Sequence, residues 1–216
     1  MSNSFAKKWG SEPGKSIFER MVGAVRPGPG LRERLIQVSY RISSLKSRLE
    51  QEAYRLQQRD KELFNKCVDA LSLKDELRAK MYAAECAEVR KVASLILRSQ
   101  LALEQVHLRL QTIQEFGDIA AVVAPVSRVV NAIRGQLLGV MPQVSYELSE
   151  VNETLNSIMI DAGVAVSGGI EIEATGEAQN ILKEAYTVAE QRMREKFPEI
   201  PVAAEKVSIE KSKNLG

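Results

Sequence analysis

The feature that most constrains this chain is a span without glycine or proline, which runs from Leu31 to Phe116. Loops and hairpin turns normally recruit these two residue types, so a span of this length is hard to place in anything but long helices. The composition agrees, because aromatic residues make up only 5% of the chain and charged residues 27%, whereas sheet proteins are rich in aromatic and β-branched residues. The sequence therefore predicts an all-α fold.

Two series of apolar residues repeat every seven residues within this span. Between them, Ser72 and Asp75 have the spacing of a capping box, in which Ser72 would start the second helix. Two helices of matched length joined by a short turn form an antiparallel hairpin. The sequence therefore predicts a long helical hairpin, whose seam contains Leu35, Ile42, Leu49, Leu56 and Leu63 in the first helix and Val89, Ile96, Leu103 and Leu110 in the second.

Beyond Gly117 the predicted helices are shorter. Pro125 is expected to interrupt the first of them, and Pro142 suits the first turn of the next. Residues 164–176 are predicted to be a flexible linker, followed by one more amphipathic helix. The resulting organisation is a basic N-terminal arm (1–30), a helical core (31–163), a linker with a C-terminal helix (164–195) and a flexible tail (196–216).

Residues that could support catalysis or metal binding are not arranged for either. In "GSEPGKS" at 10–16, the two glycines are one residue too close for a phosphate-binding loop. His107 is the sole histidine and has no ligand partner at metal-binding spacing. We interpret Cys67 and Cys86 as reduced thiols. We therefore expect a non-enzymatic protein without cofactor or metal.

The chain shows no signal peptide and no apolar run of roughly 20 residues, which would be needed to span a bilayer. We therefore expect a cytoplasmic protein whose contact with membrane, if any, is peripheral.

Charge is divided unevenly along the chain. Residues 1–70 carry 14 Lys/Arg against 8 Asp/Glu, and residues 119–216 carry 9 against 13. Hydrophobic anchors beside basic residues suit an anionic membrane surface. The alternatives are an arm that packs on a neighbouring subunit, a solvated helix face, and nucleic-acid binding, which the scarcity of aromatic residues disfavours. The candidate membrane contacts are Phe5, Lys7, Lys8, Trp9, Arg32, Arg34, Arg41, Lys46 and Arg48.

The tail contains "FPEIPV" at 197–202, where two prolines stand three residues apart. Proline favours an extended polyproline II path, which docks in a groove at little entropic cost. By composition alone, this stretch is as consistent with a linker as with a peptide ligand. The candidate contact residues are Phe197, Pro198, Ile200, Pro201 and Val202.

These features together resemble the ESCRT-III family, in particular a short member of its archaeal Cdv cell-division branch, similar to CdvB without the C-terminal winged-helix region. The likeness is carried by "AKMYAAECAEVRKVASLILRSQLALEQVHLRLQTI" at 79–113, which is similar to the family's second core helix. The resemblance implies filaments formed on membranes, with an acidic C-terminal part that folds back to restrain assembly. It also implies an MIT-domain AAA ATPase (CdvC-like) that engages a hydrophobic-Pro-x-hydrophobic-Pro peptide, as in Phe197 to Pro201.

The expected function is therefore that of a filament subunit which associates with itself and with other ESCRT-III-like subunits at the mid-cell membrane. It would remodel or constrict that membrane during archaeal cell division and be disassembled by the ATPase. The alternative is a passive coiled-coil scaffold without membrane activity. Nucleic acid is not an expected partner.

Overall fold

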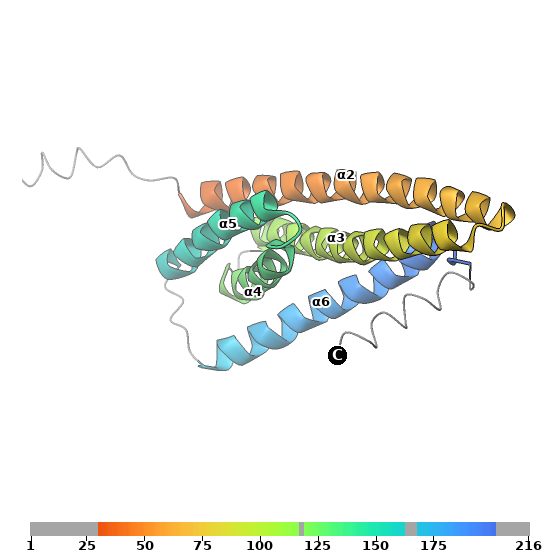
Figure 1. Ribbon diagram of the computed structural model, residues 1–216. Helices are drawn as coiled ribbons and strands as arrows, with labels where there is room; N and C mark the ends of the chain where they lie inside the picture. The colour runs from red at the N-terminus through yellow and green to blue at the C-terminus, as the bar shows by residue number, and fades with distance from the viewer. Residues whose placement is uncertain (1–29, 117–118, 163–167, 202–216) are drawn as a thin grey trace, which may run out of the picture. The chain divides into compact units, whose positions relative to one another are not determined.

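Long amphipathic helices dominate the computed structural model of this chain, which describes residues 30–116, 119–162 and 168–201. Within these ranges the regular elements are all helices, so the all-α prediction is confirmed (Figure 1). They are α2 (Leu31–Ser72), α3 (Glu76–Phe116), α4 (Ile119–Leu137), α5 (Pro142–Asp161) and α6 (Gly168–Lys196).

Helices α2 and α3 form the predicted hairpin, and a tight turn joins them. The backbone N–H of Lys74 donates to the carbonyl of Leu71 at 3.0 Å, and that of Asp75 to the carbonyl of Ala70 at 2.9 Å. This pair of bonds is the Schellman arrangement, which ends a helix on a residue in the left-handed region. Lys74 occupies that position with φ 55°, where glycine is the usual residue.

The predicted capping role of Ser72 is wrong. Its hydroxyl donates to the carbonyl of Asp69 at 2.7 Å, within the last turn of α2. The cap of α3 is instead Asp75, whose carboxylate accepts the backbone N–H of Arg78 at 3.1 Å. The reason is the turn itself, which keeps Ser72 helical and makes Asp75 the first residue free to cap α3.

The seam of α2 moves by one residue near its middle. In the first half the second seam position of each heptad is occupied by Val38 and Leu45, which are both buried. A strict heptad would continue through Glu52, Arg59 and Lys66, but the residues that face α3 are one place later: Ala53, Asp60 and Cys67. A shift of this kind follows because 3.6 residues per turn do not divide evenly into seven.

Pro125 lies inside α4 and does not interrupt it, contrary to the prediction. The proline stands in the second turn, where it removes one helical hydrogen bond near the helix N-terminus, and its side chain is buried. Pro142 opens α5 as predicted.

Helix α6 begins at Gly168, so it includes residues that the sequence assigns to a flexible linker. Tertiary packing accounts for the difference, because Ala174, within this part of the helix, and Ala178, one turn later, are buried. The last residues of the helix lie beside α3, and α6 also contacts α4.

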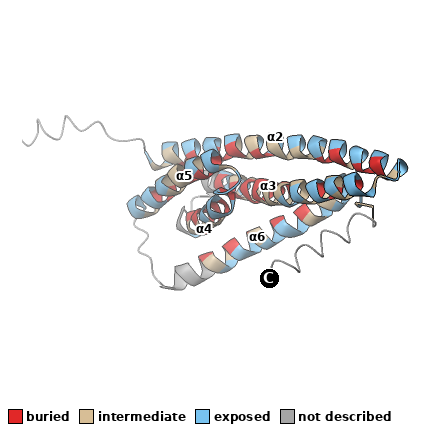
Figure 2. Ribbon diagram, in the orientation of Figure 1, coloured by how far each residue is buried: buried red, intermediate tan, exposed pale blue. Residues whose placement is uncertain are grey.

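The core lies between the hairpin and the three shorter helices. Buried residues follow the inward sides of the helices, and exposed residues follow their outer sides (Figure 2). Helix α3 contacts α2, α4 and α6, and α5 contacts α2 and α4. This arrangement places α5 along the first half of α2. The end of α6 lies along the half of the hairpin that is nearer to its turn (Figure 1).

Candidate functional site

Helix α5 presents two different faces to its neighbours. Val144, Leu148, Val151, Leu155 and Ile158 recur at helical spacing and are fully buried. The hydroxyl of Ser127 in α4 lies 2.7 Å from Oδ1 of Asn152 and 3.1 Å from Oδ1 of Asn156 in α5, and its single proton is shared between these two acceptors. These contacts fix the rotation of α5, so that a second, acidic face is directed toward α2.

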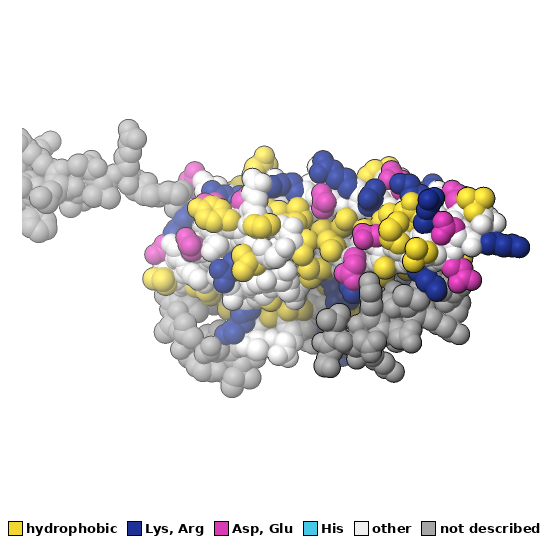
Figure 3. All heavy atoms as spheres, viewed as in Figure 1, with side chains coloured by type: hydrophobic (Ala, Val, Ile, Leu, Met, Phe, Trp, Pro, Cys, Tyr) yellow, Lys and Arg dark blue, Asp and Glu magenta, His cyan; other side chains and the backbone are white. Residues whose placement is uncertain are grey.

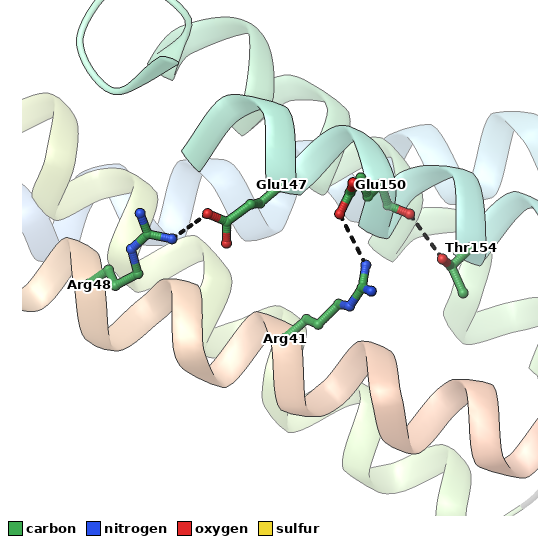
Figure 4. Close-up of polar contacts among 5 residues, drawn as sticks. All are labelled: Arg41, Arg48, Glu147, Glu150 and Thr154. Atoms are coloured by element: carbon green, nitrogen blue, oxygen red, sulfur yellow. Dashed lines mark hydrogen bonds and ion pairs between the residues drawn. The ribbon is translucent and has the colours of Figure 1, made fainter. Parts of the chain in front are cut away.

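Three arginines of α2 stand seven residues apart and therefore share one face of that helix. Each contacts a carboxylate of α5. Arg34 reaches Asp161 at 2.5 Å. Figure 4 shows the other two pairs, in which Arg41 reaches Glu150 at 3.3 Å and Arg48 pairs with Glu147. Arg34 also donates to the hydroxyl of Ser157 at 2.9 Å. We call these three ion pairs the α2–α5 clamp: Arg34–Asp161, Arg41–Glu150 and Arg48–Glu147.

Two of the three ion pairs of the clamp, Arg41–Glu150 and Arg48–Glu147, are partly exposed to solvent. In the Arg41–Glu150 pair the side chains are 53% and 44% exposed, and in Arg48–Glu147 they are 34% and 36% exposed. Ion pairs with this much access to solvent stabilise a fold by about 1 kcal/mol or less each, and salt screens them. Phosphate oxygens form the same charge-assisted hydrogen bonds with guanidinium groups as carboxylates do.

The other candidate membrane contacts are divided. Lys46 lies 3.9 Å from Glu104 of α3, and Arg32 is exposed on α2. Phe5, Lys7, Lys8 and Trp9 lie outside the described residues. On the face shown in Figure 3, basic and acidic side chains are intermixed along α2 and the end of the hairpin. The structure thus places three of the predicted membrane contacts, the arginines of the clamp, side by side and opposite carboxylates of α5.

A second set of contacts holds the end of α6 on the hairpin. Phe197 follows the last residue of α6, and its side chain is only 8% exposed. The guanidinium of Arg90 in α3 lies 5.7 Å from the centre of its ring, within the range of a cation–π contact. Arg90 in turn donates two hydrogen bonds, at 2.6 and 3.0 Å, to the carboxylate of Asp60 in α2. Asp60 is 1% exposed, so Phe197 rests on a buried ion pair that joins the two helices of the hairpin.

Ile200 makes the second contact of the tail with the hairpin. It packs against a small cluster formed by Cys67 and Ala70 of α2 and by Ala79 and Ala83 of α3. Pro198 and Glu199, which lie between the two anchors, are exposed, and Pro201 is half-buried. Val202 lies outside the described residues.

The sequence contained a signal for one of the residues that our predictions missed. Asp60 lies four residues after Leu56 and three before Leu63, a spacing that places it on the same side of the helix as these two residues, although a strict heptad selects Arg59. A helical rather than a heptad period would therefore have indicated its burial and its need for a cation. The partners of the arginines carried no such signal. The net negative charge of the C-terminal part indicated an acidic surface, but nothing local distinguished Glu147 and Glu150 from other acids.

The surroundings of the two cysteines and of the histidine indicate a structural role for these residues. Cys67 and Cys86 are free and buried, and burial raises the pKa of both thiols, that of Cys86 to about 11. Nδ1 of His107 lies 3.2 Å from the hydroxyl of Ser39. Among the described residues, no group of three or more His, Cys, Asp or Glu is placed to hold a metal ion.

None of the helices in the described part of the chain is both long and apolar enough to cross a membrane.

The chain combines a long helical hairpin, shorter helices that cover it, and an acidic C-terminal part that is folded back onto the basic half of the chain. Together these features define the ESCRT-III-like class of helical proteins. No family model and no solved structure matches the chain. Among curated proteins of Sulfolobus acidocaldarius, it is 51% identical over 149 residues to Cell division protein B1, which covers 68% of this chain and 69% of that protein. The chain therefore belongs to the Cell division protein B family, the archaeal branch of ESCRT-III.

Two further relatives from the same organism agree with this assignment. Cell division protein B is 34% identical over 146 residues, which cover 67% of this chain and 56% of that protein. Cell division protein B3 is 29% identical over 137 residues, which cover 62% of this chain and 80% of that protein. The resemblance drawn from the sequence is confirmed at the level of the family, and the names of these relatives support a role in archaeal cell division.

Proposed function

We propose that this chain is a non-enzymatic subunit that polymerises into membrane-associated filaments and remodels or constricts membrane during archaeal cell division. The observation that carries the proposal is the 51% identity to Cell division protein B1. Its partners are further copies of itself and other ESCRT-III-like subunits. The presence of several related cell-division proteins in one organism supports such co-assembly.

The α2–α5 clamp supports a membrane role for the basic face of α2. Arg34, Arg41 and Arg48 form a row that binds oxyanions, and in this conformation carboxylates of α5 occupy it. Release of α5 would turn the same row toward lipid phosphates at the mid-cell membrane. Each ion pair is partly exposed, so breaking the pairs adds little to the free energy that release requires, most of which is the exposure of the buried apolar side chains of α5.

The tail supports the proposal that an MIT-domain AAA ATPase disassembles the filament. Phe197, Pro198, Ile200 and Pro201 have the order hydrophobic-Pro-x-hydrophobic-Pro, and Val202 follows. An extended peptide of this kind offers two apolar anchors with little entropy to lose on binding. In a peptide of residues 190–216, we expect Ile200→Asp to abolish binding to an MIT domain of a Cdv-type ATPase.

Negative-stain electron microscopy of the purified chain with anionic vesicles tests the central claim. We expect filaments or coated tubules at low salt, and fewer of them at high salt, because screening weakens the contact with phosphates. A passive scaffold would instead leave bare vesicles and small discrete oligomers. A nucleic-acid-binding protein would show strongly salt-dependent affinity for DNA.

A further inference from the structure

A pocket of about 320 Å³ lies where α3, α4 and α6 meet. Arg98 lines it from α3, Gln136 from α4, and Lys183 and Tyr186 from α6. The rest of its described lining is mainly apolar and includes Ile133 of α4, which is fully buried. Among the described residues no carboxylate lines the pocket, so it combines two positive charges with an apolar floor.

Arg98 is the unusual residue of this pocket. Its guanidinium lies over the ring of Tyr186, with 4.1 Å between Cζ and the ring centre. Such stacking occupies a face of the guanidinium and leaves its N–H groups, which lie in the plane, for other acceptors. Nε of Arg98 is buried and has no hydrogen-bond partner within the described part of the chain. Because proteins rarely leave a buried donor without an acceptor, Arg98 indicates an acceptor that the chain itself does not supply.

Lys183 is placed to act with Arg98. It stands three residues before Tyr186, and therefore on the same face of α6. Its ammonium forms no ion pair with any residue that the structure describes. Glu190, one turn after Tyr186, is engaged elsewhere, because it accepts a hydrogen bond from the Tyr186 hydroxyl and thereby raises the pKa of that tyrosine. The two cations of the pocket are thus without a counter-charge from the chain.

We propose that this pocket binds a phosphomonoester, whose phosphate group lies between Arg98 and Lys183. A phosphate monoester carries roughly 1.5 to 2 negative charges at pH 7, which suits two cations. The guanidinium fork matches phosphate oxygens in a bidentate arrangement. The apolar floor favours a phosphate that carries an organic body over inorganic phosphate, since small-molecule sites are mostly apolar with a few placed polar groups. A free phosphomonoester and a lipid phosphate share this chemistry.

The site exists only while α6 lies on α3 and α4, because its polar groups come from all three helices. A ligand that binds one arrangement of a protein stabilises that arrangement by mass action. Binding should therefore oppose local opening of α6. The site does not depend on the proposed function, and its loss would leave that proposal untouched.

Isothermal titration calorimetry of the full chain with phenyl phosphate tests the site. We expect saturable binding that is tighter than that of inorganic phosphate, and a loss of roughly 10-fold or more in Arg98→Gln. Lys183→Gln should weaken binding several-fold. Lys91→Gln is the matched control, because it removes a charge from α3 at a position that is 71% exposed and outside the pocket. It should leave the affinity unchanged.

A second measurement separates binding from folding, because Arg98→Gln also removes the contact with Tyr186. Lys183 is exposed, so Lys183→Gln should keep the wild-type fold. In the wild type, phenyl phosphate should slow hydrogen exchange in α6, and in Lys183→Gln the same concentration should have a smaller effect.

The site is overturned if the wild type shows no saturable binding, or if Arg98→Gln and Lys183→Gln bind as tightly as the wild type. A further titration distinguishes the two sources of the phosphate. Displacement of phenyl phosphate by vesicles that contain phosphatidic acid would assign the site to a lipid phosphate. Persistence of phenyl phosphate in their presence would assign it to a free phosphomonoester, and either result supports the site.

Discussion

At the scale of single residues, the buried ion pair between Asp60 and Arg90 has the largest expected effect on stability. Asp60→Leu would leave the charge of Arg90 buried without its partner, since the Arg90 side chain is only 16% exposed. We expect a loss of about 3–5 kcal/mol in the free energy of unfolding, measured by urea denaturation. The double variant Asp60→Leu/Arg90→Met should recover most of that loss. A single variant as stable as the wild type would show that the pair is already solvated.

The thiol of Cys86 gives the chain a dependence on alkaline pH. Burial, together with the nearby carboxylate of Asp60, raises its pKa to about 11 from the ordinary value of 9.0. Between these values the unfolded chain loses the thiol proton and the folded chain keeps it, so stability falls as pH rises. We expect urea midpoints to decline from pH 9 to pH 11, and to decline less steeply in Cys86→Ala. Parallel curves for the two proteins would contradict this assignment.

At the scale of elements, α6 is held less firmly than the two helices of the hairpin. Among residues 174–196 of this helix, whose burial the structure describes, the buried ones are Ile181 and four alanines: Ala174, Ala178, Ala185 and Ala189. A buried methyl group contributes roughly 0.8 kcal/mol, compared with about 1.5–3 kcal/mol for a larger aliphatic side chain. Local opening of α6 should therefore require less free energy than opening of α2 or α3.

Hydrogen exchange measured by mass spectrometry checks this difference. We expect amides of α6 to exchange before those in the middle of α2 and α3. Ala185→Glu, which buries a charge, should accelerate exchange in α6 and leave the hairpin protected. Val188→Glu is the matched control, because Val188 is 40% exposed on the same helix. Equal acceleration in α6 and in the hairpin would mean that they open as one unit.

At the scale of the whole molecule, we propose that the α2–α5 clamp links conformation to membrane contact. Glu147→Gln/Glu150→Gln removes two of its carboxylates and leaves the arginines unchanged. We expect this variant to co-sediment with anionic vesicles several-fold more than the wild type at low salt, because the arginines are freed for phosphate. High salt should reduce the difference by screening.

Glu153→Gln provides the control for the clamp, since Glu153 is exposed on α5 and takes no part in the three ion pairs. It changes the net charge of the same helix without touching the three pairs. If it enhanced vesicle binding as much per charge as the clamp variant, net charge alone would explain the effect, and the clamp would have no specific role.

The sequence by itself determined the hairpin, because both long helices follow from local information. The absence of glycine and proline and the apolar repeat are both signals that span only a few helical turns. In a helix with 3.6 residues per turn, the repeating apolar residues lie on one side and form a stripe that is buried. The same local logic failed where two local signals competed. Ser72 has the residue type of a cap, yet the turn at Lys74 keeps it helical, and Pro125 is carried inside α4 by burial.

Tertiary structure alone decided which charges and anchors meet. Arg41 and Glu150 are separated by 109 residues, and Arg34 and Asp161 by 127. No local pattern in α2 specifies the acids of α5 that will face it, because that depends on how the buried stripe of α5 rotates the helix against α4. The contacts of the tail likewise follow from no local pattern. Its composition left a linker and a ligand equally open, and only the meeting of α2, α3 and α6 placed Phe197 over Arg90.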